Sequence, residues 1–163
     1  QNNKPEEFVA AWQHVVKKFR ELGVKNVIWV WAPQPAYLRY GEYYPGDEYV
    51  DWVGVGALNY GTVASWSKWW SFKEIYGNYY KWLDMLNKPM MITEMGCLKV
   101  GGSREDWFKE AFNNIPKDYP RLKALIFFND NDDKTTLNKS LNWSIVDDSA
   151  TCTIVRNAIS ETW

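Results

Sequence analysis

Residues 89–96 read Pro-Met-Met-Ile-Thr-Glu-Met-Gly, an apolar run with a proline at its start and a glycine at its end. The run lacks the alternation of apolar and polar side chains that marks a strand with one wet face, so it predicts a strand buried on both faces. Glu94 closes the predicted strand over 89–94, with no cation beside it in the sequence. A carboxylate in that position is costly unless it is hydrogen-bonded or used, which makes Glu94 the first candidate functional residue.

Three further apolar runs, over 26–31, 51–57 and 123–128, have the same character. Helical spacing of apolar residues is found over 6–22, 72–86 and 149–162, and in a helix that Ser103 caps together with Asp106. Strands that alternate with helices predict an α/β fold with a parallel sheet. Two architectures fit: a small doubly wound sheet and a partial (β/α)8 TIM barrel, because a complete barrel needs about 200 residues or more and this chain has 163.

The composition excludes several classes of protein. A formal net charge of -1 with 24% charged residues argues against a disordered chain and against a strongly cationic nucleic-acid binder. No apolar run approaches the roughly 20 residues that cross a bilayer. The first residues lack the apolar region of a signal peptide, so we expect that such a segment was removed or never existed. We therefore expect no nucleic-acid partner and no membrane segment.

Histidine and cysteine are too few for most metal and nucleophile chemistry. The chain has one histidine, His14, and two cysteines, Cys97 and Cys152, without the spacing of a zinc site or of a cysteine–histidine pair. Glycine-rich phosphate-binding loops are also absent. We therefore expect no metal and no cofactor, a surface or packing role for His14, and a small buried apolar role for Cys97.

Aromatic residues make up 17% of the chain and include eleven tryptophans. Tryptophan is difficult to bury completely because its indole N–H needs a hydrogen-bond partner. Such an excess is typical of a wet aromatic surface, as in a sugar-binding cleft, but a tryptophan-rich core has the same composition. Both interpretations stay open on composition alone.

In a parallel α/β fold the functional residues gather where strands end and the following loops begin. The candidates at these ends, besides Glu94, are Trp31, Asn59, Tyr60 and Asn129, while Trp66 and Trp143 lie in or next to the polar segments that follow two of the predicted strands. Aromatic rings beside a strand-end glutamate suit a glycosidase, in which a retaining enzyme places two carboxylates about 5–5.5 Å apart. Asp130 and Asp132 are the in-chain alternatives for the second carboxylate, although residues 129–142 have the composition of a polar loop. Asn59 and Asn129 either position sugar hydroxyls or the Glu94 carboxylate, or cap strand ends.

A family resemblance rests on ordered motifs along nearly the whole chain: FVAAWQHVVKKFRELGVKNVIWVWAPQ, YYPGDEYVDWVGV, NYG, WWSFKEIYGNYYKWL, KPMMITEMG, REDWFKEAF and YPRLKALIFFN. This series resembles the C-terminal half of the glycoside hydrolase family 26 (β-mannanase) barrel. It is most similar in character to the hydrolase-like domains that accompany bacterial polysaccharide-synthesising glycosyltransferases. The resemblance implies that residues 1–163 form strands five to eight with their helices, and that the protein is extracellular or in the cell envelope.

The resemblance also assigns roles to residues. It places Glu94 at the nucleophile position, at the end of strand seven, and it places the acid/base glutamate of the family upstream of Gln1, outside this chain. Leu58 stands where the family often has a tyrosine that contacts the nucleophile, and Tyr60 is a nearby candidate to replace it. The aromatic and amide candidates Trp31, Asn59, Tyr60, Trp66, Asn129 and Trp143 become the predicted substrate-binding residues.

Three functions remain open at this point. The first is a fragment of a retaining β-glycoside hydrolase that acts on mannan-like or related β-linked polysaccharide. The second is a non-catalytic carbohydrate-binding module that serves polysaccharide synthesis or export, and the third is a doubly wound domain unrelated to sugars. A half-barrel exposes sheet edges and an apolar inner face, so we expect it to pack against either the missing N-terminal half or a second copy of the chain. The resemblance implies a polysaccharide or oligosaccharide as a further partner.

Overall fold

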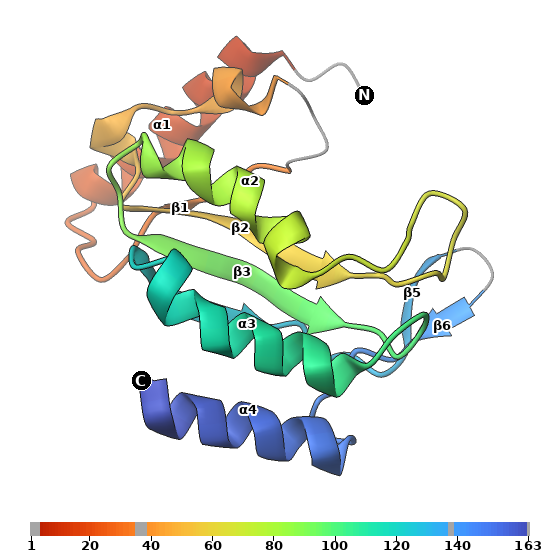
Figure 1. Cartoon of the computed structure of the whole chain (residues 1–163). Coiled ribbons are helices and arrows are strands. Elements are labelled where there is room, and N and C mark those ends of the chain that lie inside the picture. The colour runs from red at the N-terminus through yellow and green to blue at the C-terminus, as the bar shows by residue number, and fades with distance from the viewer. Residues whose placement is uncertain (1–3, 35–38, 137–138, 163) are drawn as a thin grey trace.

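A computed structural model of the chain describes residues 4–34, 39–136 and 139–162. Its main sheet has four parallel strands, β1 (Val30–Trp31), β2 (Trp52–Asn59), β3 (Met90–Cys97) and β4 (Leu122–Phe127), in the spatial order β1-β2-β3-β4 (Figure 1). The spatial order equals the sequence order, as in a segment of a barrel, whereas a doubly wound sheet reverses its order at a switch point. The fold is therefore α/β, and its strand order is that of a partial barrel.

The described chain has four helices, α1 (Pro5–Glu21), α2 (Phe72–Asp84), α3 (Arg104–Asp118) and α4 (Ser149–Thr162), each close to its predicted range. Helices α2 and α3 lie side by side along the sheet and α4 lies beyond α3 (Figure 1). Helix α1 packs instead against two short 3-10 turns, η1 (Tyr40–Tyr43) and η2 (Asp47–Tyr49). Within the described residues, no helix combines the length and the hydropathy that crossing a membrane requires.

Side-chain caps fix where α2 and α3 begin. The Ser103 half of the predicted capping box of α3 is confirmed, because Oγ of Ser103 accepts a hydrogen bond from the backbone N–H of Asp106 at 3.1 Å; the return bond to the Asp106 carboxylate is not found among the described residues. Helix α2 has a complete capping box: Oγ of Ser71 accepts from the Glu74 N–H, and the Glu74 carboxylate accepts from the Ser71 N–H at 2.8 Å. The capping box thus fixes the position at which the loop after β2 ends and α2 begins.

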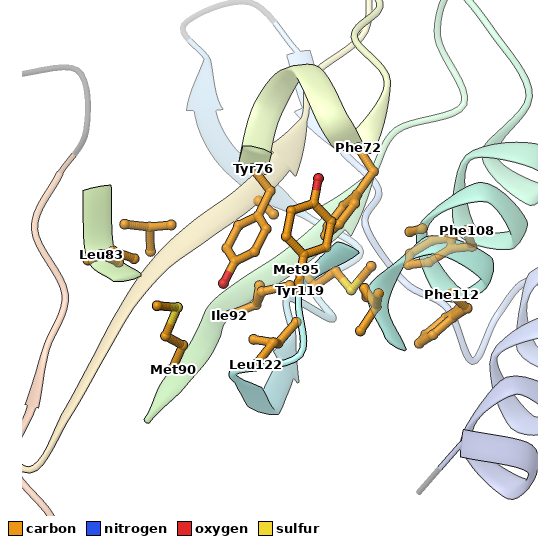
Figure 2. Close-up of a cluster of buried hydrophobic side chains, with 14 of the residues drawn as sticks. Phe72, Tyr76, Leu83, Met90, Ile92, Met95, Phe108, Phe112, Tyr119 and Leu122 are labelled. Atoms are coloured by element: carbon orange, nitrogen blue, oxygen red, sulfur yellow. The ribbon is translucent and has the colours of Figure 1, made fainter. Parts of the chain in front are cut away.

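The core lies between the sheet and the helices α2, α3 and α4. Figure 2 shows strand side chains such as Ile92 and Met95 packed among rings from α2 and α3, including Phe72 and Phe108, each of them at most 1% exposed. Successive core residues of β3, Met90 and Ile92, are two residues apart, because strand side chains alternate between the two faces. This packing buries the side chains of β2 and β3 that face the helices.

Strand bounds differ most from the sequence prediction at β1 and β3. Strand β1 covers only two of the predicted residues 26–31, because the Trp29 N–H donates to the Asp51 carboxylate at 2.8 Å and so does not extend the ladder. Strand β3 runs three residues beyond the predicted end, because it keeps pairing with β2 as far as Asn59 and Cys97. Glu94 therefore lies inside β3 and not at its end.

The segment predicted as a polar loop contains a second, two-stranded sheet. Strands β5 (Asp133–Thr136) and β6 (Lys139–Leu141) form an antiparallel hairpin between β4 and α4. Polar hairpins of this kind carry little hydrophobic periodicity, and their pairing depends on contacts that lie far away in sequence.

Candidate active site

A groove of about 780 Å³ contains Glu94. Its walls come from the ends of β1 and β2, from β3, from the loop after β2 and from α2. The lining residues are Ala32, Pro33, Gln34, Gly56, Leu58, Tyr60, Trp66, Trp70, Glu74, Ile75, Tyr79, Thr93 and Glu94.

A one-residue register shift turns Glu94 into this groove. Val55 of β2 pairs with Ile92, but the next residue, Gly56, pairs with Glu94, so β3 holds one extra residue at this point. With strict alternation Glu94 would face the same side as the buried Ile92. The extra residue lets Thr93 and Glu94 both line the groove, and the buried pattern resumes at Met95. Bulges of this kind are known to re-aim side chains next to active sites.

Glu94 is exposed, and within the part of the chain that the structure describes its carboxylate has no hydrogen bond or ion pair. The sequence alone did not exclude an ion pair between Glu94 and a lysine or arginine elsewhere in the chain. No such ion pair is found among the described residues. Gly56 lies opposite, and a methyl group there would be 3.5 Å from Oε2 of Glu94. The carboxylate is therefore presented to the groove and open to a ligand.

Tyr60 and Trp66 share the groove with Glu94. The Tyr60 ring packs edge-on against Trp66, with 5.1 Å between centroids, and against Trp143 at 4.9 Å. Burial is the main cause that raises the pKa of Tyr60; the charges of Asp133 and Glu94 raise the pKa further, and the Thr135 side chain acts in the opposite direction. Tyr60 is thus a neutral hydroxyl close enough to Glu94 to sense its charge, and Trp66 is 61% exposed at the groove.

Two aromatic side chains of the groove were not predicted. Trp70 precedes α2, and Tyr79 lies on the helix itself. Tyr79 belongs to a helix whose apolar spacing indicated only core packing. The polar, tryptophan-rich stretch over 59–72 was the available signal for Trp70.

Two predicted substrate-binding tryptophans lie in the interior. Trp31 is 2% exposed and packs against Tyr44 and Trp82, with centroid distances of 4.9 and 5.7 Å. Trp143 is fully buried, and its indole N–H donates to the Asp133 carboxylate at 2.8 Å. Neither ring has a free face for a sugar in this structure, because both rings are buried, and for Trp143 the indole N–H has its hydrogen-bond partner in Asp133.

The side chains of the two predicted amide residues, Asn59 and Asn129, form hydrogen bonds with backbone groups. Asn59 is fully buried; its Nδ2 donates to the Trp70 carbonyl at 2.8 Å, and its Oδ1 accepts from the Gly61 N–H at 3.0 Å. Asn129 accepts a hydrogen bond from the Ile145 N–H at 2.8 Å. Of the two roles that the sequence left open, both amides have the capping role in this structure. Asn59 hydrogen-bonds to both ends of the loop that carries Trp66.

The alternative carboxylates lie outside the groove. Asp130 accepts a hydrogen bond from the Asp132 N–H at 2.9 Å, and Asp132 contacts Ser140 at 2.6 Å and Lys134 at 2.9 Å. Both residues therefore stabilise the turn that leads into the β5–β6 hairpin. The groove does contain a second carboxylate, Glu74, but this side chain closes the capping box of α2.

Metal and thiol chemistry gain no support from the described residues. They contain no cluster of three or more histidine, cysteine, aspartate or glutamate side chains able to hold a metal ion. Burial raises the pKa of the Cys97 thiol to about 12, and the side chain is 1% exposed. A thiol in that environment is a poor nucleophile, because the thiolate is the reactive form.

The chain matches the family model of Glycosyl hydrolase family 26 over residues 1–154. It is 34% identical to endoglucanase H of Acetivibrio thermocellus, over 88% of this chain and 16% of that protein. It is 28% identical to a mannan endo-1,4-β-mannosidase of Bacillus subtilis, over 88% of this chain and 41% of the relative. The chain thus spans less than half the length of either relative.

Solved structures agree on the fold. A Bacillus subtilis mannanase superposes with a TM-score of 0.61 at 20% identity, over 96% of this chain and 40% of that one. A related structure from a Muricauda species gives a TM-score of 0.65 at 18% identity, over 98% of this chain and 43% of the other. Coverage of this kind is that of a partial TIM barrel.

Proposed function

This chain belongs to glycosyl hydrolase family 26, and from that premise we propose that it is the C-terminal half of a retaining β-glycoside hydrolase with Glu94 as the nucleophile. The proposed substrate is a mannan-like or related β-linked polysaccharide. The observation that carries the proposal is the register shift in β3, which directs an unpartnered carboxylate into a groove with aromatic walls. The names of two relatives, an endoglucanase and a mannan endo-1,4-β-mannosidase, agree with a β-linked glycan.

In the proposed reaction a carboxylate oxygen of Glu94 attacks the anomeric carbon, and the bond from that carbon to the glycosidic oxygen breaks. A general acid must protonate the departing oxygen, and water then hydrolyses the glycosyl ester with the same residue acting as base. That residue has to stand about 5–5.5 Å from the nucleophile. The other carboxylate known in the groove, Glu74, is committed to its cap, so we propose that the acid/base glutamate comes from a segment outside this chain.

The proposed partner is therefore the N-terminal half of the barrel. Apolar side chains are left uncovered on α1, before β1 and on β4, where such a half would pack. They are Val15, Leu22, Ile28 and Ile126, with exposures of 44, 76, 63 and 53%. Native mass spectrometry tests this proposal: a one-to-one complex with the separately produced N-terminal half is expected, and a chain that stays monomeric in its presence would contradict it.

A glycosyl fluoride can test Glu94 without the acid/base residue, because fluoride leaves without protonation. The probes are 2-deoxy-2-fluoro glycosyl fluorides of β-1,4-linked mannobiose and cellobiose. Attack by Glu94 forms a glycosyl ester and releases fluoride, and the fluorine at C2 slows hydrolysis of the ester. Intact mass and peptide mapping should place one label on Glu94 in the chain alone or in its complex with the N-terminal half. Glu94→Gln is the control and should take up no label.

One observation favours a second candidate function, a non-catalytic carbohydrate-binding module. Asp130 and Asp132 lie in the turn before β5 and not in the groove. Among the described residues, the carboxylates that line the groove are therefore Glu94 and Glu74, and Glu74 is used in the capping box of α2. Under this alternative the probes leave Glu94 unlabelled even in the assembled protein, while β-linked oligosaccharides still bind. Isothermal titration of both wild type and Glu94→Gln with mannohexaose and cellohexaose separates the two functions.

A further inference from the structure

Asp133 is a buried carboxylate that the proposed reaction does not use. It opens the β5–β6 hairpin and is 6% exposed. Its Oδ2 accepts hydrogen bonds from Nε1 of Trp143 at 2.8 Å and from Oγ1 of Thr135 at 3.0 Å, and its Oδ1 accepts the Thr135 N–H at 2.9 Å. Burial by itself would raise the pKa of Asp133, but these hydrogen bonds outweigh it and hold the pKa below its ordinary value. Asp133 is therefore a fixed anion below one wall of the groove.

Trp143 connects this anion to the strand that carries Glu94. Its ring lies so close to Gly96, two residues after Glu94, that a methyl group on Gly96 would be 2.9 Å from Cε3 of the indole. The backbone N–H of Trp143 donates to the Asp130 carbonyl at 2.7 Å, and its indole N–H donates to Asp133. Both ends of the residue are thus held, and the ring is fully buried.

The indole in turn holds a ring of the groove. The indole packs edge-on against Tyr60, at 4.9 Å between centroids and 86° between planes, and Trp66 makes a second edge contact with the same ring at 5.1 Å. Trp66 is 61% exposed and so gives Tyr60 a weak support, whereas Trp143 is immobilised. Tyr60 and Glu94 line the same groove.

We propose that Asp133 is a positioning residue for the Glu94 site: it fixes the indole of Trp143, and the indole fixes the Tyr60 ring beside Glu94. The inference rests on the proposed function for the role of Glu94, but not for the arrangement of the three side chains. When Asp133 is removed, the indole N–H loses its acceptor, and a buried donor without a partner favours another ring orientation. Tyr60 then leaves its place in the groove wall.

The same hairpin offers a matched control. Asp132 is adjacent to Asp133 and exposed, and it contacts Ser140 and Lys134 without touching Trp143. Asp132→Ala therefore loosens the hairpin while the acceptor of the indole stays in place. A general effect of hairpin stability would appear in both variants, whereas positioning through Trp143 would appear only when Asp133 is changed.

The first experiment measures whether Tyr60 still senses Glu94. Tyrosine labelled with ¹³C at Cζ reports the pKa of the Tyr60 hydroxyl, with its resonance assigned by Tyr60→Phe. Glu94→Gln removes a negative charge and should lower the pKa of Tyr60 in wild type and in Asp132→Ala. The same substitution should leave the pKa of Tyr60 unchanged when it is introduced into Asp133→Ala.

Two further variants keep this test decisive if Asp133→Ala does not fold. Trp143→Phe removes the indole N–H and should abolish the response of Tyr60 in the same way, and Asp133→Asn, which retains one acceptor oxygen, should restore part of it. A response of wild-type size in Trp143→Phe or in folded Asp133→Ala overturns the proposal.

The second experiment uses the glycosyl fluorides and separates positioning from folding. The protein is used in the same form, alone or in complex with the N-terminal half, in which Glu94 is labelled. Asp133→Ala and Trp143→Phe should lower the rate constant of labelling at saturating probe about tenfold or more, and the probe concentration that gives half of that rate should stay nearly unchanged. A variant that merely unfolds in part would be labelled to a smaller extent at the wild-type rate constant, and that result counts against positioning. If wild type takes up no label while Tyr60 still responds to Glu94→Gln, the proposed function fails and the positioning of Tyr60 by Asp133 stands.

Discussion

The two faces of the main sheet differ in how completely this chain covers them. On the face toward the helices, Val53, Ile92 and Met95 are fully buried beneath α2 and α3. On the opposite face, Glu94 is exposed and Ile126 of β4 is 53% exposed. The helix-covered face therefore carries the stability of the chain, while the open face carries the candidate chemistry and the surfaces that await a partner. Substitutions on the two faces should separate these properties.

The largest contrast is expected between a core ring and an apolar residue of the open face. Phe108 of α3 is fully buried, and Phe108→Ala should lower the free energy of unfolding by about 3–5 kcal/mol, because it removes apolar burial and leaves a cavity. Ile126→Ala should cost less than about 1 kcal/mol, as for other exposed positions. Urea denaturation of the isolated chain measures both, and equal losses would mean that the open face is packed as well.

Two glycines sharpen the comparison within the open face. A methyl group on Gly96 would lie 2.9 Å from the Trp143 ring and 3.1 Å from Leu58, whereas at Gly56 the closest atom is Oε2 of Glu94 at 3.5 Å. Gly96→Ala should therefore cost about 1–3 kcal/mol through overpacking, and Gly56→Ala distinctly less. Denaturation curves of the two variants decide the matter; a tolerant Gly96 would show that Trp143 is not held against β3.

An ion-pair network fastens the end of the helix-covered side. Asp148 contacts Lys99 at 2.8 Å and the buried Arg104 at 3.6 Å, and it accepts a hydrogen bond from Oγ1 of Thr151 at 2.6 Å in the first turn of α4. Burial tends to raise the pKa of Asp148, but Lys99 and Thr151 lower it to about 2, from an ordinary value of 3.8.

The pH dependence of stability follows from the direction of that shift. A carboxyl whose pKa is lower in the folded state stabilises the protein above its unfolded pKa, and the contribution is lost as the pH falls toward the folded pKa. The contribution of Asp148 should therefore be complete above about pH 4 and disappear toward pH 2, with an amplitude of about 1–2 kcal/mol. Urea denaturation measures the free energy of unfolding at pH 5 and at pH 2.5, and the loss between these two values should be smaller for Asp148→Asn than for wild type. An equal loss in both proteins would assign the acid sensitivity to other carboxylates.

The smallest effect on stability is expected at the candidate nucleophile itself. Glu94 is exposed and its carboxylate has no hydrogen-bond or ion-pair partner among the described residues, so Glu94→Gln should change the free energy of unfolding by no more than about 0.5 kcal/mol. The same variant should lose all labelling by the glycosyl fluorides. A marked loss of stability would show that the carboxylate is tied into the fold and not reserved for a ligand.

Much of the fold could be predicted because its causes are local. Unbroken apolar runs predicted the four strands, helical spacing predicted the four helices, and Ser103 with Asp106 located the start of α3. The β5–β6 hairpin could not be predicted, since its polar residues carry no periodicity. The short β1 was missed because Asp51, distant in sequence, takes the Trp29 N–H.

The candidate site divides in the same way. Glu94 and Tyr60 were identified from their positions at or near strand ends and Trp66 from the polar, aromatic segment after the second predicted strand, and the structure brings all three to one groove. Trp31 and Trp143 were predicted as sugar platforms, but composition does not tell a wet ring from a buried ring with a partner for its N–H. Burial depends on tertiary contacts such as the one between Trp143 and Asp133, which a single sequence does not reveal.

The extra residue in β3 makes the length of this strand part of the site. Inserting one residue between Val55 and Gly56 of β2 would give Thr93 a partner, restore the two-residue alternation along β3 and turn Glu94 toward the side on which Ile92 is buried. The chain would then have to bury an unpaired charge or give up the packing of its core. Deleting Thr93, in contrast, would leave Glu94 opposite Gly56 on the groove side. The relative lengths of β2 and β3 are thus a sharper guide than residue identity to whether a relative with these strands can still present its glutamate.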